Sequence, residues 1–367
     1  MSSPRQLEKI KVEGYKSIRE LTLDLHPLNV LIGANGAGKS NFISLFKLLN
    51  KIMEKRLQEC TSQAGGADNF LYFGQKQTDE IKIALEFGHN GYTCTLMPTV
   101  DDRLAFREEK CWFIGQYRAT PYEISLGAGH EETRLEEKAR SEPVAASVLE
   151  ALQSWRVYHF HDTSESARVK KTGDIHDNSR LRPDAANLAA FLYLLSEKHR
   201  SHYDQIVMTT RLAAPFFDDF ILKPLPNNPD KILLEWRERG QDNYLNVGFL
   251  SDGTLRFICL ATLLLQPDSL KPSVIVIDEP ELGLHPYAIT LLASLLKSVA
   301  ASRQVIVSTQ SVPLVNQFTI DDVIVVDRED QQSTFKRWAK KDLAHWLDEY
   351  GLDDLWEKNL LGGRPQG

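Results

Sequence analysis

The segment at residues 33–40, Gly-Ala-Asn-Gly-Ala-Gly-Lys-Ser, constrains the fold of this 367-residue chain more than any other feature. It matches the pattern GxxxxGK[ST] at every fixed position. An apolar run at 28–32 precedes it, and a helix-like apolar periodicity over 39–53 follows it. A chance glycine-rich turn is the alternative. A strand before and a helix after favour instead the loop that wraps nucleotide phosphates in P-loop proteins.

The residue types in this segment suit a nucleoside triphosphate. Glycines let the backbone approach the phosphates without a Cβ clash. We expect Lys39 to reach the β- and γ-phosphates and the hydroxyl of Ser40 to hold Mg²⁺. The residues expected to bind ATP in and beside this loop are Asn35, Gly36, Ala37, Gly38, Lys39, Ser40 and Asn41. The sequence therefore predicts an ATP site that also uses Mg²⁺.

A second pattern, at residues 274–279, is an apolar strand that ends in two adjacent carboxylates. In P-loop enzymes an acid at such a strand end holds Mg²⁺, which we assign to Asp278. Because side chains alternate along a strand, Glu279 points elsewhere, and we expect it to act as the general base on the attacking water. A solvated strand end is the alternative, and the P-loop upstream favours the functional interpretation.

Apolar runs that alternate with helical patterns predict the fold class. Continuous apolar runs at 304–308 and 322–326 are typical of buried parallel strands, and helices are expected between them. We therefore expect an α/β P-loop fold with a mixed sheet flanked by helices. The expected parts are an N-terminal half at 1–100, an inserted helical and irregular middle lobe at 101–230, a C-terminal half at 231–330 and a helical tail at 331–367. In the tail, Trp346 and Trp356 are expected to anchor the packing.

Residues 250–254, Leu-Ser-Asp-Gly-Thr, precede a helical pattern and lie between the P-loop and the acidic strand. Alone, they are compatible with a simple helix N-cap. In this order along the chain they resemble the signature of ABC-type ATPases, usually Leu-Ser-Gly-Gly followed by Gln or Glu. Asp252 replaces the first glycine of that signature, and Thr254 replaces its last residue, the Gln or Glu. The resemblance implies that Ser251 and Gly253 contact nucleotide.

Two segments beyond the acids resemble the RecF and SMC proteins of this superfamily. Residues 280–286, Pro-Glu-Leu-Gly-Leu-His-Pro, are similar to their D-loop region. Residues 305–311 are similar to their switch segment, in which Gln310 stands where histidine is usual. The resemblance implies a catalytic role for Gln310, whose amide can hydrogen-bond a γ-phosphate but cannot ionise.

The N-terminus adds a third resemblance. Residues 13–19, Glu-Gly-Tyr-Lys-Ser-Ile-Arg, are similar to the opening of these families, which implies that Lys16 and Ser17 lie near the nucleotide. Gln75 and Gln77 are both candidates for the glutamine of the Q-loop. The chain's ending, from Tyr350-Gly351-Leu352 through Leu361-Gly362-Gly363, is similar to that of stand-alone bacterial ATPases of the RecF-like group, relatives of the overcoming-lysogenization-defect proteins. The chain is thus identified as a member of the RecF/SMC-like ABC-type ATPases.

This resemblance implies a function and a mechanism. It implies that the chain binds and hydrolyses ATP as a head-to-tail homodimer with two sandwiched ATP molecules. It further implies work in DNA repair, chromosome maintenance or phage defence, on DNA or with a separate nuclease-like or toxin-like effector protein. The alternative is an ATP-gated scaffold or regulator of a partner protein with negligible hydrolysis, which Gln310 favours. A third class is the motor subunit of a membrane transporter, against which the middle insertion argues.

Composition limits the compartment and the partners. No run of 18 or more apolar residues occurs, and the first residues hold no apolar segment, so we expect neither a membrane span nor a secretory signal. Four scattered cysteines without a CxxC pair predict a cytoplasmic protein without disulfides or a cysteine zinc site. The net charge of −7 gives no support for DNA binding, which would need a local basic face.

Three other groups of residues carry open alternatives. His159 and His161 could belong to a metal site or could be structural histidines. A basic stretch at 168–171, with Arg180 and Arg182, could contact a phosphate backbone or form a solvated loop. The phenylalanines near Pro215 fit a core better than a base-stacking platform; they are Phe216, Phe217 and Phe220.

Overall fold

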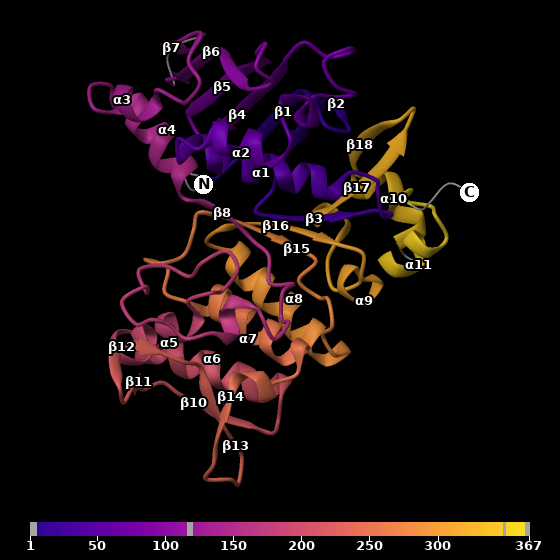
Figure 1. Cartoon of the computed structure of the whole chain (residues 1–367). Coiled ribbons are helices and arrows are strands. Elements are labelled where there is room, and N and C mark those ends of the chain that lie inside the picture. The colour runs from indigo at the N-terminus through magenta and orange to yellow at the C-terminus, as the bar shows by residue number, and fades with distance from the viewer. Residues whose placement is uncertain (1–5, 116–119, 348–349, 364–367) are drawn as a thin grey trace.

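The computed structural model describes residues 6–115, 120–347 and 350–363 (Figure 1). Its centre is a six-stranded sheet with the strand order β18-β17-β3-β16-β15-β8. The bounds are β3 (Leu28–Ile32), β8 (Trp155–Tyr158), β15 (Val274–Asp278), β16 (Gln304–Thr309), β17 (Val323–Glu329) and β18 (Gln332–Arg337). All neighbouring pairs are parallel except β17 and β18, which form an antiparallel hairpin. The sheet is therefore mixed.

Both faces of this central sheet are buried, which explains why its strands read as continuous apolar runs. On one face, α1 (Lys39–Met53) packs on side chains such as Val276 and Ile306. On the other, α7 (Asp252–Leu265) and α8 (Pro286–Ala300) share a core with Ile275 and Val307. The alternation of neighbouring strand residues between two cores places a helix layer on each face. The predicted α/β fold, with a mixed sheet flanked by helices, is confirmed.

A second sheet covers the far side of α1 (Figure 1). It has six antiparallel strands in the order β2-β1-β4-β5-β6-β7. The bounds are β1 (Lys9–Tyr15), β2 (Ile18–Asp24), β4 (Ile81–Phe87), β5 (Asn90–Pro98), β6 (Leu104–Phe113) and β7 (Tyr122–Gly127). The elements that share its core are α2 (Leu57–Gln63), η1 (Ala67–Phe70), α3 (Leu135–Ala139) and α4 (Pro143–Gln153).

A lobe of helices and small sheets extends from the opposite face of the central sheet (Figure 1). Its helices are η2 (Arg168–Lys170), α5 (Leu188–Lys198), α6 (Arg200–Ala213) and η3 (Val247–Phe249). Its strands are β9 (Gly173–Asp174), β10 (Phe217–Ile221), β11 (Pro224–Leu225), β12 (Asn228–Ile232), β13 (Glu235–Glu238) and β14 (Tyr244–Asn246). The remaining elements of the chain are α9 (Val312–Val315), η4 (Ile320–Asp322), α10 (Lys340–Leu347) and α11 (Leu352–Glu357).

The boundary expected at residue 101 falls inside the second sheet. Strand β6 pairs with β5 along its whole length, and β8 pairs with β15 in the central sheet. Residues up to 158 therefore form the two sheets and the helices packed on them, and we propose a lobe that begins after β8. Strand β8 is held by β15, a partner more than 100 residues further along the chain, which no local pattern reveals.

The structure tests three local predictions from the sequence and confirms only parts of them. The loop expected at 61–68 is wrong in its first part, since α2 continues to Gln63. Trp346 is exposed and does not anchor the tail, whereas Trp356 is buried in the large core. Phe217 and Phe220 are core residues as expected, while Phe216 is exposed and its ring packs on Trp236. Within the described part of the chain, no helix is both long enough and apolar enough to cross a membrane.

Candidate nucleotide-binding site

Strand register brings the candidate residues to one edge of the central sheet. Ile32, the last residue of β3, lies opposite Thr309 at the end of β16. Ser308 of β16 in turn lies opposite Asp278 at the end of β15. Because these strands are parallel, the P-loop, the acidic pair and the switch segment all leave the sheet at the same edge. This edge is where ligands bind in open α/β sheets.

Two glycines of the P-loop are required by backbone geometry. Gly33 packs so closely on β17 that a Cβ there would lie 2.2 Å from the carbonyl oxygen of Val326. Gly38 has a φ of 120°, and a Cβ there would lie 2.0 Å from the hydroxyl of Ser333. Gly36 is different, because nothing lies within 4 Å of its would-be Cβ. The tip of the loop is thus open, and Asn35, Gly36 and Ser40 are exposed there.

The side-chain ammonium of Lys39 turns back into the P-loop. Its Nζ donates hydrogen bonds to the carbonyl oxygens of Gly33 and Ala34, at 2.6 and 3.0 Å. Burial lowers the pKa of Lys39, while the charges of Glu279 and Asp278 act in the opposite direction. Gly33, which accepts from this ammonium, directly follows the end of β3, so Lys39 lies at the sheet edge that also carries the acidic pair. Among the described residues its hydrogen bonds go only to neutral carbonyls, so the ammonium lacks a direct anionic partner that a phosphate could supply.

The turn between β1 and β2 braces the loop from the other side. Ser17 Oγ lies 2.7 Å from Ser333 Oγ and accepts a hydrogen bond from the side chain of Asn41 at 2.6 Å. Ser333 Oγ also donates to the carbonyl of Ala37. Lys16 has a φ of 49°, and its Nζ donates to Ser44 Oγ at 3.1 Å. The structure thus brings Lys16, Ser17 and Asn41 beside the loop, and it adds Ser333 of β18, which the sequence did not point to.

Asp278 is contacted by groups from strand β16 and from the segment that follows β8. Its Oδ1 accepts a hydrogen bond from the hydroxyl of Ser308. Nδ1 of His159 lies 3.8 Å from its Oδ2, and Nε2 of His161 lies 3.0 Å from its main-chain oxygen. No group of three or more potential metal ligands occurs among the described His, Cys, Asp and Glu residues, so these histidines form no preassembled metal centre there.

The second acid is fixed by the switch segment. Nε2 of Gln310 donates to Oε1 of Glu279 at 2.6 Å. Glu279 has a φ of 42°, in the left-handed region, and its main-chain amide donates to the carbonyl of Ser308 at 2.9 Å. A third acid, Glu281, accepts hydrogen bonds from the hydroxyl of Thr309 and the amide of Gln310. Burial raises the pKa of Glu281. The acids and the switch therefore form one hydrogen-bonded unit.

The signature segment lies at the start of α7. Ser251 caps this helix by accepting a hydrogen bond from the amide of Thr254, and it is exposed. A Cβ on Gly253 would lie 2.2 Å from the carbonyl of Gly283. The guanidinium of Arg256 donates to the carbonyl of Leu282 at 2.9 Å. The signature therefore packs on the D-loop-like segment of its own chain.

Some predicted site residues do not join the cluster at the P-loop. Ser251 and Gly253 contact Thr254 and Gly283 instead. Gln75 donates to the carboxylates of Asp68 and Asp102, and Gln77 lines a separate surface hollow.

Sequence reasoning missed several residues around the acids. Glu281, Ser308 and Thr309 lie there without a role assigned from the sequence, and His159 and His161 had been noted only as open alternatives. Ser333, beside the P-loop, was missed altogether. The run Tyr-His-Phe-His-Asp at 158–162 was the one signal for the two histidines, but its position beside Asp278 depends on β8 pairing with β15.

Comparisons with known proteins agree with this geometry. Residues 28–316 match the family described as "AAA domain, putative AbiEii toxin, Type IV TA system". A segment of 80 residues is 31% identical to the chromosome partition protein Smc of Mycoplasma genitalium, and it covers 21% of this chain and only 8% of that relative.

Two solved structures are similar over nearly their whole length. One is the Smc head bound to the C-terminal winged-helix domain of ScpA, with a TM-score of 0.61 and 16% identity. It covers 92% of this chain and 99% of that one. The other is the Smc head with an extended coiled coil, bound to the C-terminal domain of ScpA, from Pyrococcus furiosus. Its TM-score is 0.60 at 14% identity, covering 94% of this chain and 98% of that one.

The structural likeness shows the fold, and the family match covers most of the chain. The expected resemblance to SMC- and RecF-like ABC-type ATPases is thereby confirmed. The chain belongs to the family described as "AAA domain, putative AbiEii toxin, Type IV TA system", and its fold is that of SMC heads.

Proposed function

We propose that this protein binds ATP at the loop of residues 33–40 and hydrolyses it as an ATP-dependent homodimer. The observation that carries the proposal is the single edge at which Lys39, the acidic pair and Gln310 meet. The open tip at Gly36 and the exposed Ser40 leave room for the phosphates. Backbone amides at a helix N-terminus, with a lysine that lacks an anionic partner among the described residues, suit a triphosphate.

The donor set also fits Mg²⁺. Ser40 and Asp278 would hold the ion through oxygen atoms, and the ion would neutralise phosphate charge. Mg²⁺ is usually held by one or two protein oxygens together with substrate phosphates, so a site without a larger ligand cluster is the expected kind.

Glu279 is the residue we propose as general base. Its carboxylate, oriented by Gln310, would accept the proton from the attacking water while Lys39 balances charge on the phosphates. Gln310 cannot itself take up a proton, so its part is to hold Glu279 and to donate to the γ-phosphate. The same property supports the alternative of an ATP-gated scaffold with slow turnover.

The dimer follows from where the signature lies. Ser251 is exposed at the N-terminus of α7 and bonds within its own turn, so it is available to the ATP of a second copy. Large apolar side chains stand exposed nearby in the chain, with Phe249 at 74%, Leu282 at 44% and Tyr287 at 51%. An exposed apolar group beside polar ligand groups is typical of a protein interface.

The biological setting is proposed from the relatives. Their names point to chromosome partition and to toxin-antitoxin systems, so we propose a role in DNA maintenance or phage defence with a separate effector protein. ScpA bound to the similar Smc heads supports a partner protein for this chain as well. We retain a cytoplasmic location, with DNA as a further candidate partner.

One experiment separates the enzyme from the scaffold. Phosphate release by the purified chain is measured with Mg²⁺ and ATP, with and without added DNA. Release that requires Mg²⁺ and disappears in Lys39→Ala supports the ATPase. ATP binding without release under either condition supports the scaffold instead, and a filter-binding titration across salt concentrations tests DNA contact.

A further inference from the structure

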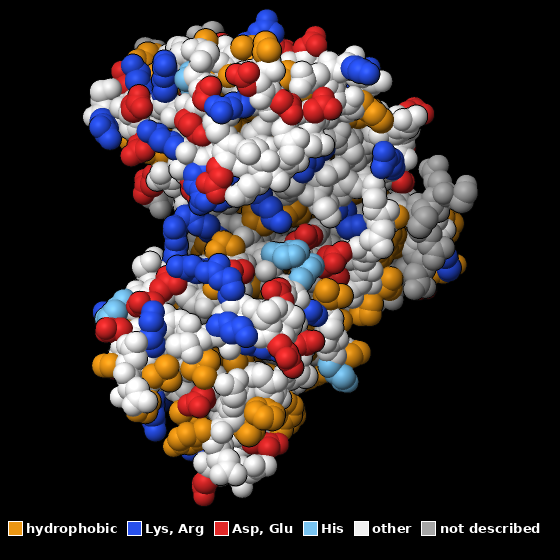
Figure 2. All heavy atoms as spheres, viewed as in Figure 1, with side chains coloured by type: hydrophobic (Ala, Val, Ile, Leu, Met, Phe, Trp, Pro, Cys, Tyr) orange, Lys and Arg blue, Asp and Glu red, His pale blue; other side chains and the backbone are white. Residues whose placement is uncertain are grey.

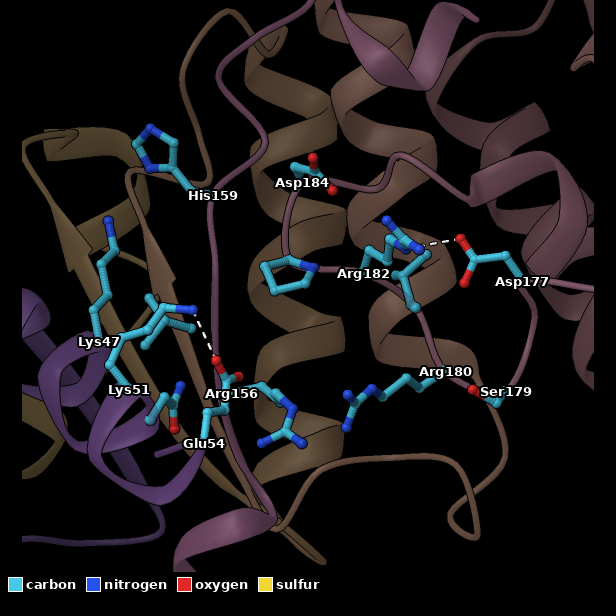
Figure 3. A pocket seen from close by; sticks show the side chains of 14 residues that line it. Lys47, Lys51, Glu54, Arg156, His159, Asp177, Ser179, Arg180, Arg182 and Asp184 are labelled. Carbon is cyan, nitrogen blue, oxygen red and sulfur yellow. Dashed lines mark hydrogen bonds and ion pairs between the residues drawn. The ribbon is translucent and has the colours of Figure 1, made fainter. Parts of the chain in front are cut away.

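A basic pocket lies between α1, β8 and the loop before α5 (Figure 3). It has a volume of about 590 Å³. Its basic side chains come from three separate parts of the chain and converge on one hollow; they are Lys47, Lys51, Arg156, Arg180 and Arg182. Figure 2 shows a group of blue Lys and Arg side chains at the waist between the two halves of the molecule.

Ion pairs neutralise only part of this charge. Lys51 pairs with Glu54 at 2.8 Å, and Arg182 pairs with Asp177 at 2.7 Å. The remaining carboxylate of the lining, Asp184, pairs with Arg168 outside the pocket at 3.3 Å. Among the described residues, Lys47, Arg156 and Arg180 form no ion pair within 4 Å.

The two arginines face each other without a counterion. One nitrogen of the Arg156 guanidinium donates to the main-chain oxygens of Gln153 and Trp155, which are neutral groups. Burial lowers the pKa of Arg156, and the charge of Arg180 lowers it further. Two guanidiniums this close repel each other unless an anion lies between them. In Figure 3 their side chains point toward each other across the hollow.

The residues that line this pocket favour one kind of anion. A guanidinium presents a planar fork of donors that matches a phosphate in two-point contact. Beside these donors stand the apolar side chains of Val157, Leu181 and Pro183. The volume lies in the range of pockets that enclose small organic ligands. Charge, apolar wall and size together fit a phosphate ester that carries a ring, which is the chemistry of a nucleotide.

We propose that this Arg156 pocket is a second anion site, which binds a phosphorylated ligand of nucleotide size between Arg156 and Arg180. The pocket is separate from the P-loop, because Lys47 lies two turns, or about 10 Å, along α1 from Ser40. It is still next to the first site, since His159 lines the pocket and lies 3.8 Å from Asp278. The phosphate can come from a free nucleotide or from the phosphorylated end of a nucleic-acid strand.

The test uses the full chain carrying Lys39→Ala, so that the P-loop does not bind the probe. Calorimetric titrations use inorganic pyrophosphate, a 5′-phosphorylated thymidine dinucleotide, and the same dinucleotide without its 5′-phosphate. We expect the phosphorylated dinucleotide to bind and the dephosphorylated one to bind at least tenfold more weakly, on the order expected for charged hydrogen bonds. Binding of pyrophosphate as well identifies a free phosphate source, and binding of the dinucleotide alone identifies a strand end; both support the site.

Matched variants test whether this pocket binds the phosphorylated dinucleotide. Arg180→Gln should weaken the phosphorylated dinucleotide at least tenfold, and Lys47→Gln should weaken it too; both side chains are exposed, so folding should persist. Arg103→Gln is the control, because it removes the same charge from an exposed pair with Glu131, and Arg103 lies in the turn between β5 and β6, away from the pocket. Equal affinity in Arg180→Gln and Arg103→Gln would overturn the proposal. So would binding of a 20-nucleotide strand when no short probe binds, because that indicates an open groove.

Discussion

Gln310 donates a hydrogen bond from its side-chain Nε2 to Oε1 of Glu279 at 2.6 Å. Glu279 also has left-handed backbone geometry, with a φ of 42°, which costs roughly 1–3 kcal/mol in a residue other than glycine. Such strain persists where the surroundings hold it, and the amide of Gln310 is one of the groups that do. A residue that cannot ionise thus positions the carboxylate at the end of β15.

Replacement of Glu279 by glutamine should separate binding from hydrolysis. The substitution keeps the size and the hydrogen bond to Gln310 but removes the base, so turnover should fall by about 10²- to 10⁴-fold. ATP binding should persist, and light scattering should show that the dimer accumulates with ATP. Hydrolysis at the parent rate in Glu279→Gln would mean that another group activates the water.

Substitutions at Gln310 should test its positioning role. Gln310→Ala removes the hydrogen bond to Glu279, so turnover should fall by about one to two orders of magnitude. Gln310→His returns an N–H donor to the same place and should recover part of the activity. Steady-state phosphate release measures both variants. If Gln310→Ala and Gln310→His lose the same activity, a hydrogen bond donated from this position does not support catalysis.

The sequence predicted those parts of the site that depend on local patterns. The P-loop, the strand that ends at Asp278 and the helix over Lys39–Met53 need only neighbours in the chain, and the structure has that helix with the expected bounds. The chemical roles of their side chains remain predictions.

The contacts that the sequence could not predict depend on strands and loops that meet across long stretches of the chain. His159 reaches Asp278 only because β8 pairs with β15, and Ser333 reaches Ser17 only because the β17–β18 hairpin turns back beside the P-loop. The start of the lobe after β8 depends in the same way on the pairing of β8 with β15, whose sequences lie more than 100 residues apart.

Lys39→Ala should remove tight ATP binding. The ammonium lies inside the loop, near the acidic pair, so its loss removes charge-assisted contacts to phosphate and leaves the acids unopposed. Nucleotide affinity should fall at least tenfold, as expected for hydrogen bonds to charged groups. Fluorescent-nucleotide titration measures the change, and Arg103→Ala, which removes an exposed positive charge far from both pockets, serves as the comparison. Unchanged affinity in Lys39→Ala would place ATP elsewhere.

Gly253→Ala should destabilise the contact between the signature and the D-loop-like segment. The new Cβ would meet the carbonyl oxygen of Gly283 at 2.2 Å, and backbone cannot yield as a flexible side chain can. The expected loss is about 1–3 kcal/mol in the free energy of unfolding. Gly248→Ala is the matched control, because its nearest neighbour would lie at an ordinary 3.5 Å. Equal unfolding midpoints in denaturant for the two variants would contradict the close packing described for Gly253.

The most direct test of the shared ATP site is the mixing of two inactive variants. Ser251→Arg keeps its P-loop but loses the signature, and Lys39→Ala keeps its signature but loses the P-loop. Each mixed dimer has one intact site of two, so roughly a quarter to a half of the parent's phosphate release should return, depending on how many dimers are mixed. Recovery near that level is the predicted result. A mixture as inactive as either variant alone would contradict a site completed by a second copy.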